Sequence, residues 1–243
     1  MEKEMIKSRF QVNVLATIAA VSILGCTAIA GSLPLVNGSF ESPQTTFATP
    51  TIDGWVTDGP ILDPQFGFNP FTGVFLNTAP AEPDHITNVD QDQIAFIGTQ
   101  TGNEIVQVIS GTPFQPGEYT LTAGVAISLG ASPAATDALR LALFYEDDAG
   151  ARQIVASTDI LNDAATGLSA NLLKTFDTSA VLDLSSPAIG RDVGVLITTI
   201  GQPDGFFDID AVSVSFIPEP TSLALMTLAG LMGLKRRSVT LKA

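Results

Sequence analysis

An aromatic loop is the first candidate for chemistry in this chain. Residues 59–77 carry Phe66, Phe68, Phe71 and Phe75 among glycine, proline and asparagine. Aromatic faces in a loop can stack on sugar rings while neighbouring polar groups bond hydroxyls, so the pattern predicts a sugar-binding platform. The alternative is that these rings pack into one end of the fold, because phenylalanine is usually buried and sugar platforms favour tryptophan and tyrosine. Both interpretations stay open.

Acidic residues are numerous enough to raise the question of catalysis by paired carboxyl groups, as in glycoside hydrolysis. Glu146, Asp147 and Asp148 are consecutive, and Asp90 and Asp92 lie close together. Both groups fall in predicted turns or loops, where solvated carboxylates rather than a tuned acid–base pair are expected. The sequence contains no phosphate loop, dinucleotide fingerprint or HExxH motif. We therefore predict a protein that is not an enzyme, with a polysaccharide-acting enzyme as the alternative.

Histidine and cysteine are too scarce to build other kinds of site. His85 is the single histidine, so a multi-histidine zinc site is excluded, and no G-x-S-x-G motif offers it a serine partner. Cys26, the single cysteine, lies in the N-terminal apolar run. The body of the chain therefore has no disulfide and no thiolate ligand.

The charge of the body excludes another class of partner. Residues 31–217 hold 4 basic and 22 acidic side chains, so this region carries 4 − 22 = −18. Such a field repels nucleic acid and anionic lipid headgroups and attracts cations. We expect no binding to nucleic acid.

The first thirty residues have the three parts of a secretory signal peptide. A basic start is followed by an apolar run over residues 14–25 and then by the small residues Ala28 and Ala30, which mark a cleavage site. The predicted signal peptide spans residues 1–30. A lipoprotein signal at Cys26 and an uncleaved anchor are the alternatives, and each of them also predicts export of the body.

The C-terminal segment, residues 218–243, has a different pattern. Its three parts, in order, are Pro218-Glu219-Pro220, the uncharged apolar run 221–234, and Lys235-Arg236-Arg237. The prolines separate the apolar run from the body, and basic residues stop a translocating segment, so the run predicts a short transmembrane helix rather than a core helix. The whole resembles the PEP-C-terminal sorting signal of exported bacterial proteins. That resemblance implies processing by an exosortase-type membrane protease; a retained membrane anchor is the alternative.

Period-two alternation dominates the body, residues 31–217. In residues 119–129, Tyr119, Leu121, Val125 and the other odd-numbered side chains share one face. Further strands are predicted at 93–98, 103–109, 138–146, 151–157, 192–201 and 208–216, with a hairpin turn at 146–150. Residues 162–173 could hold a short helix. The pattern predicts an all-β fold, an antiparallel sandwich or jelly roll.

Several short landmarks resemble galactose-binding-like jelly rolls, a group that includes many carbohydrate-binding modules. They are LVNGSFESP at 35–43, Gly54-Trp55, VQVI at 106–109, PGEYTLT at 116–122 and FDIDAVSVS at 207–215. In such domains an acid in the last strand and one after the first Asn-Gly often share a structural calcium. The resemblance therefore implies a calcium site at Glu41 and Asp210, although Ala211 stands where a second polar residue is usual.

The period-two alternation of the last predicted strand also bears on Asp210. It predicts that Asp210 shares the core-facing side of the last strand with Val212, Val214 and Phe216. A carboxylate there is costly unless it is paired, holds a cation or caps backbone N–H groups.

These features together predict an exported cell-surface or matrix-associated protein. Its predicted role is a non-catalytic structural or glycan-binding component of an extracellular polysaccharide layer.

Overall fold

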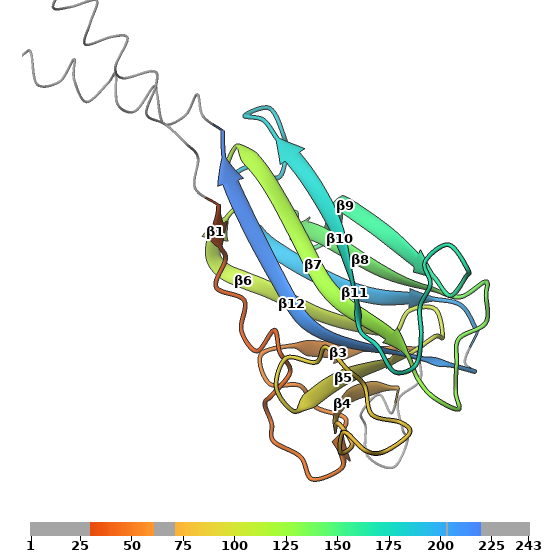
Figure 1. Cartoon of the computed structure of the whole chain (residues 1–243). Helices are drawn as coiled ribbons and strands as arrows, with labels where there is room; N and C mark the ends of the chain where they lie inside the picture. The colour runs from red at the N-terminus through yellow and green to blue at the C-terminus, as the bar shows by residue number, and fades with distance from the viewer. Residues whose placement is uncertain (1–29, 61–70, 203, 220–243) are drawn as a thin grey trace, which may run out of the picture. The chain divides into compact units, whose positions relative to one another are not determined.

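Twelve β-strands form the regular structure of the part of the chain that the computed structural model describes, residues 30–60, 71–202 and 204–219 (Figure 1). They are β1 Gly31–Ser32, β2 Ala48–Thr49, β3 Val56–Asp58, β4 Thr72–Leu76, β5 Gln93–Gly98, β6 Glu104–Pro113, β7 Gly117–Ile127, β8 Ala138–Glu146, β9 Arg152–Leu161, β10 Lys174–Leu182, β11 Asp192–Ile200 and β12 Phe206–Pro218. None of the described residues forms a helix suited to crossing a bilayer.

The predicted terminal signals fall almost entirely outside the described residues. This applies to Ala28 in the signal peptide and to everything from Pro220 onward, including the membrane segment 221–234, Lys235, Arg236 and Arg237. Pro218 is the last residue of β12, and Glu219 comes directly after it. Export and sorting therefore stay predictions.

The strands form two antiparallel sheets packed as a sandwich, which confirms the predicted fold class. Sheet A has the order β10-β7-β12-β5-β4-β2, with β1 beside β12, and sheet B has the order β3-β6-β11-β8-β9. The chain passes back and forth between the sheets, and among the described strands only β1–β2, β4–β5 and β8–β9 follow one another within one sheet. Sheets with one face on a shared core alternate apolar and polar residues, and this is the pattern that the sequence shows.

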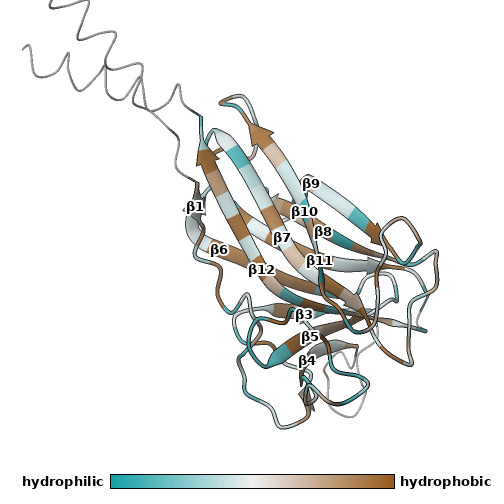
Figure 2. Ribbon diagram, viewed as in Figure 1, coloured by the Kyte–Doolittle hydropathy of each residue, from teal (hydrophilic) through white to brown (hydrophobic). Residues whose placement is uncertain are grey.

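The core lies between the inner faces of the two sheets. Sheet A contributes Tyr119, Leu121 and Val125, and sheet B contributes Leu139 and Leu141, all of them buried. Figure 2 shows the resulting bands of hydrophobic and hydrophilic residues along β7 and β12. The predicted face of residues 119–129 is thus confirmed along β7, whereas Leu129 lies past its end and is exposed. Trp55 is also buried in the core.

The hairpin predicted at residues 146–150 is present between β8 and β9. The Asp147 carboxylate Oδ1 accepts hydrogen bonds from the backbone N–H groups of Ala149 and Ala151, both at 2.9 Å. Gly150 has a φ of +76°, which lies in the left-handed region that glycine tolerates best. Local side-chain and backbone chemistry therefore determines this turn.

The short helix predicted within residues 162–173 is wrong. Asp163 Oδ1 accepts from the N–H groups of Ala165 and Thr166 at 2.9 Å, as an N-cap would, but only a turn follows. Gly167, at φ +61°, ends that turn in the left-handed conformation, and β10 begins at Lys174. A cap without a following apolar stripe does not sustain a helix.

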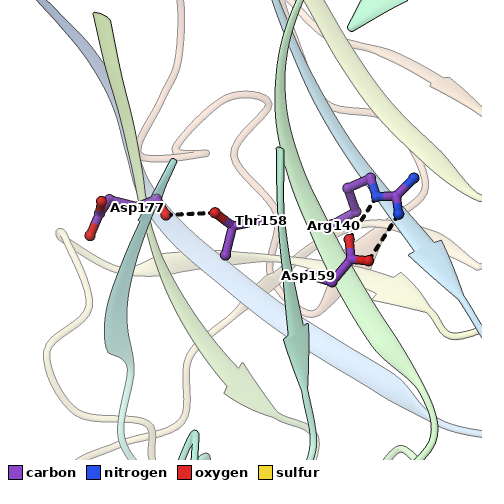
Figure 3. A network of polar contacts seen from close by, with 4 residues as sticks. All are labelled: Arg140, Thr158, Asp159 and Asp177. Carbon is purple, nitrogen blue, oxygen red and sulfur yellow. Dashed lines mark hydrogen bonds and ion pairs between the residues drawn. The ribbon is translucent and has the colours of Figure 1, made fainter. Parts of the chain in front are cut away.

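The edges of the two sheets are joined where β9 meets β10 (Figure 3). Thr158 Oγ1 donates a 3.0 Å hydrogen bond to the backbone carbonyl of Asp177. On the neighbouring strand pair, Arg140 donates to both carboxylate oxygens of its cross-strand partner Asp159, at 2.6 and 2.9 Å. This pairing is bidentate but partly exposed, so its contribution to stability is small.

Strand β12 changes face at Ala211. Phe207 and Ile209 belong to the core, and so do Val212 and Val214, so the alternation shifts by one residue between them. Ala211 has a φ of +51°, which identifies a bulge at this point. The prediction that Asp210 shares a face with Val212 is therefore wrong: with Asp208, it lies on the side opposite the core.

Candidate functional site

A pocket of about 370 Å³ opens on the outer face of sheet A, where β2, β4, β5 and β12 lie side by side. Aromatic and aliphatic side chains form most of its wall, and two carboxyl groups contribute to it. The lining residues are Phe47, Ala48, Phe75, Leu76, Thr78, Asp84, Phe96, Ser128, Phe206 and Asp208.

The strand pairing explains why these rings meet. Phe96 of β5 is the cross-strand partner of Asp208 in β12, so both face away from the core. The Phe75 and Phe96 rings are 6.3 Å apart, and the Phe96 and Phe206 rings are 6.1 Å apart. Phe47, before β2, is 83% exposed and lies at the rim. The result is a pocket walled by four phenylalanines from different parts of the chain.

Asp208 is the unusual group in this pocket. It is only 2% exposed, and its carboxyl has no hydrogen bond or ion pair to any described residue. Burial alone raises the pKa of Asp208 to about 8 from an ordinary 3.8. The carboxyl is therefore protonated at neutral pH and can donate a hydrogen bond into the pocket. Asp84, by contrast, is exposed at the rim.

The loop of residues 77–92 covers the neighbouring part of the same sheet face. Its Ile86 packs with Ile94, Ala126 and Leu173 in a small apolar cluster outside the main core. Asn77 holds the loop closed, because its side chain donates to the Ile86 carbonyl at 2.8 Å and accepts from the Ile86 N–H at 3.1 Å. The loop thereby places Thr78 and Asp84 against the pocket.

His85 has a structural position in this loop. Its ring Nδ1 lies 2.6 Å from the Thr78 carbonyl, the distance of a hydrogen bond that the ring N–H donates. The side chain is half-buried and does not line the pocket. The hydrogen bond to Thr78 therefore fixes the loop rather than preparing the histidine for catalysis.

The predicted aromatic platform is only partly described. Phe66 and Phe68 lie outside the described residues. Phe71 is half-buried, and its ring stacks on that of the pocket residue Phe206, with the ring centroids 6.2 Å apart. Of the described residues of the predicted loop, Phe75 and Leu76 line the pocket, and Phe75 is the aromatic one. The platform therefore stays a prediction, with Phe71 supporting a lining residue rather than forming the surface.

Sequence reasoning missed the other pocket residues. Phe47, Phe96 and the neighbouring Phe206 and Asp208 come from three segments that are separated by tens of residues. The one available signal was Asp208, an acid inside the otherwise apolar run Phe206–Ile209, because an unexplained acid in a strand often marks a site.

The predicted cation ligands, Glu41 and Asp210, converge on one short segment, residues 90–93. Asp210 Oδ2 accepts from the Asp90 N–H at 2.6 Å. Glu41 Oε1 accepts from the N–H groups of Asp92 and Gln93, both at 2.8 Å. Both carboxylates thus hold the same loop, which is the capping role that the sequence left open as an alternative to a metal.

The electrostatics of this locus nonetheless fit a cation. Asp210 is fully buried, and its Oδ1 atom has no hydrogen-bond partner. Burial raises the pKa of Asp210 to about 7, and the nearby charges of Asp90 and Glu41 also raise it, against hydrogen bonds from the Asp90 and Ala211 backbone. An orphaned buried carboxylate oxygen beside other acids is the donor type that calcium prefers.

The ligand set would not come from side chains alone. Across residues 30–60, 71–202 and 204–219, no three His, Cys, Asp or Glu side chains are grouped so that they could hold a metal ion. Backbone carbonyls and water would have to complete the coordination, as they commonly do for calcium.

The loop that carries Glu41 is built around Asn37. The Asn37 side chain donates to the carbonyls of Ser42 and Asp53 at 2.7 and 2.9 Å, and its backbone carbonyl accepts from Trp55 Nε1 at 3.1 Å. Asn37 itself has a φ of +52°, which asparagine tolerates better than most residues. The Asn-Gly and Gly-Trp landmarks therefore form one unit that positions Glu41.

Comparison with known proteins shows the fold. No family model matches this chain, and no curated protein matches it. The Stig cyclase Fisc from Fischerella sp. TAU, solved with (3Z)-3-(1-methyl-2-pyrrolidinylidene)-3H-indole, is similar at 21% identity with a TM-score of 0.60, over 78% of this chain and 99% of that one. A cyclase from the same source, solved with 4-(1H-indol-3-yl)butan-2-one, matches at 20% identity and a TM-score of 0.59, over 78% and 99%.

A more distant likeness is to carbohydrate-binding modules. The CBM22-1 xylan-binding domain of Paenibacillus barcinonensis Xyn10C matches at 10% identity with a TM-score of 0.44, over 68% of this chain and 87% of that domain. The cyclase matches support the β-sandwich fold of this chain.

Proposed function

We propose that this protein is an exported glycan-binding component of an extracellular polysaccharide layer and that it binds a sugar unit without transforming it. The observation that carries the proposal is the pocket on sheet A, whose lining combines four phenylalanines with the buried Asp208. Sugar rings present apolar C–H faces and polar edges, so an aromatic wall with one or two oriented polar groups is suited to them.

The roles of the residues follow from their positions. Phe47, exposed at the rim, offers a ring face on which a sugar can stack. Asp208, protonated by burial, donates to a hydroxyl or ether oxygen, while Asp84 accepts from hydroxyls at the mouth. Stacking and a few hydrogen bonds give modest affinity for one unit, which suits a surface protein that meets a polymer with many repeats.

Export and sorting belong to the same proposal. The N-terminal residues 1–30 would direct secretion, and Pro218-Glu219-Pro220 with the following apolar run and Lys235-Arg236-Arg237 would be recognised by an exosortase-type membrane protease. The module would then act at the cell surface or in the extracellular matrix, held in the membrane through residues 221–234 until it is released.

The test is retention of the protein, purified from the cells that make it, on their own extracellular polysaccharide in affinity electrophoresis. Phe47→Ala should reduce retention about tenfold, which is about 1.4 kcal/mol of binding free energy. Leu184→Ala removes an equally exposed apolar side chain, 81% exposed and outside the pocket, and should change nothing. Absence of retention in the unaltered protein, or equal losses in both variants, would argue against the pocket as a glycan site.

A second candidate function is a polysaccharide-acting enzyme, and one observation favours it. Asp208 is a buried acid with a raised pKa, and the exposed Asp84 lines the same pocket. Glycosidases use two carboxyl groups in such different environments, one as proton donor and one as carboxylate. Release of shorter oligosaccharides by the unaltered protein, abolished in Asp208→Asn, would favour this function over binding alone.

We propose in addition that Glu41 and Asp210 share a structural calcium. The orphaned Oδ1 of Asp210 supports this, and the ion pairs of the described residues give neither carboxylate a basic partner. The ion would hold the loop of residues 90–93 to β12 and supply no chemistry to the pocket.

A further inference from the structure

The pocket on sheet A brings ring faces and carboxyl groups together without any positive charge. The described residues that line it include two acids, Asp84 and Asp208, and no Lys, Arg or His. A ring face is negative at its centre, so aromatic walls attract cations, and carboxyl oxygens accept their hydrogen bonds. The aromatic rings and the carboxyl groups therefore both favour a positively charged ligand.

Asp208 is the residue in this pocket whose buried carboxyl lacks a hydrogen-bond partner among the described residues. Its carboxyl is almost fully buried, lies beside its strand partner Phe96, and makes no hydrogen bond or ion pair with the described residues. A buried polar group without a partner is costly, and a ligand that supplies the missing donor recovers that cost. The structure thus leaves a buried acceptor at the ligand site.

The basic side chains of residues 31–217 do not supply a positive charge to this pocket. Residues 31–217 contain only four basic side chains. Each has a partner elsewhere: Arg140 with Asp159, Arg152 with Glu104, Arg191 with Asp148, and Lys174 with the Thr166 carbonyl. With a charge of −18 over the same region, the field of the module also concentrates cations near its surface.

We infer that the sugar unit which this pocket selects carries a protonated amine, as in a glycan with free amino groups. This inference rests on the proposed glycan-binding function and names its ligand class. The ammonium group would lie against the phenylalanine rings and donate hydrogen bonds to Asp208, while Asp84 at the mouth adds a second favourable charge. The carboxyl groups and ring faces would repel an acidic glycan. A neutral glycan would gain nothing from their attraction for positive charge.

The test compares two probes of equal length, the β-1,4-linked trimer of glucosamine and that of N-acetylglucosamine. They differ only in the acetyl groups that remove the charge. Titration calorimetry at pH 6, where the free amines are protonated, should show the glucosamine trimer binding at least tenfold more tightly to the purified full-length protein. In Asp208→Asn, which keeps the side-chain shape, that ratio should fall to about two to three, the part that Asp84 supplies.

Two controls keep the outcome interpretable. Asp84→Asn, at an exposed position, should lower the ratio about two- to threefold without a change in melting temperature, so it tests the same idea if Asp208→Asn folds poorly. Leu184→Ala should leave the ratio unchanged.

Equal or tighter binding of the acetylated trimer, or a ratio that survives both Asp variants, would overturn the amine preference. The glycan-binding function would stand in that case, provided that Phe47→Ala weakens binding of whichever glycan binds. If the unaltered protein retains no polysaccharide and binds neither trimer, both proposals fail together.

Discussion

The backbone N–H of Asp90 donates a 2.6 Å hydrogen bond to Oδ2 of Asp210, so a loop residue is joined to one that lies 120 positions later in the chain. The bond leaves Oδ1 of the same carboxylate buried without a partner. This asymmetry is the reason to expect a ligand at Asp210 rather than a simple cap. The carboxylate has one oxygen satisfied by the fold and one that the described residues leave unsatisfied.

Calcium should therefore stabilise the protein through Asp210. At a calcium concentration about a hundred times the dissociation constant, linkage gives about 2.7 kcal/mol, or a rise in melting temperature of roughly 5–10 °C that a chelator reverses. Asp210→Asn should remove the response, whereas Asn at the exposed Asp204 should keep it. Thermal unfolding with and without calcium measures both. No shift at millimolar calcium would leave Asp210 as a capping residue only.

The stability of the metal-free protein should fall as the pH rises. Burial raises the pKa of Asp208 to about 8 and that of Asp210 to about 7, from 3.8 in an unstructured chain. Between the unfolded-state pKa of 3.8 and the folded-state pKa values, the folded state binds more protons than the unfolded state. The free energy of unfolding therefore decreases from about pH 4 to pH 8. The stability is complete below pH 4 and is lost as the pH passes through the folded-state values.

Denaturant unfolding in chelator at pH 5 and pH 8 checks this pH dependence. The difference between the two pH values should amount to several kcal/mol, since each unit of pKa shift corresponds to about 1.4 kcal/mol. Asp208→Asn should reduce the difference, because the substituted side chain does not titrate. A stability that increases from pH 5 to pH 8 in chelator would contradict the raised pKa values.

Gly194 should not tolerate a side chain. A Cβ built at Gly194 would lie 2.4 Å from the ring of Phe144, which is fully buried against it on the outer face of sheet B. Gly194→Ala should therefore cost about 1–3 kcal/mol through overpacking, seen as a lower denaturation midpoint. Gly31→Ala is the matched control, because no atom lies within 4 Å of a Cβ there. Equal effects at both glycines would show that the Phe144 ring yields.

The C-terminal tail makes a prediction of its own. If it is a sorting signal, mass spectrometry of the protein recovered from the cell surface should show chains that end near Pro220. Recovery of chains that still contain Lys242 would exclude processing and leave a membrane anchor as the remaining interpretation. The test requires the native host, because the protease is part of the mechanism.

Local patterns in the sequence were enough for the fold class. Alternation with a period of two is a property of neighbouring residues, so the strands around Leu121 and Leu141 were predictable one by one. The same holds for the hairpin turn, where Asp147 bonds to backbone groups two and four residues away. Trp55 was predictable as a core residue because its type and its preceding glycine favour burial.

Tertiary structure decided the candidate site. The bulge at Ala211 reverses the side to which Asp210 points, and nothing in the local alternation reveals a single residue with positive φ. The pocket depends on which strands pair, since Phe96 meets Asp208 only through the pairing of β5 with β12. The raised pKa of Asp208 follows from that burial. Whether a segment forms a strand depends on short stretches of sequence. Register, burial and the ligand site arise from contacts between segments far apart in sequence.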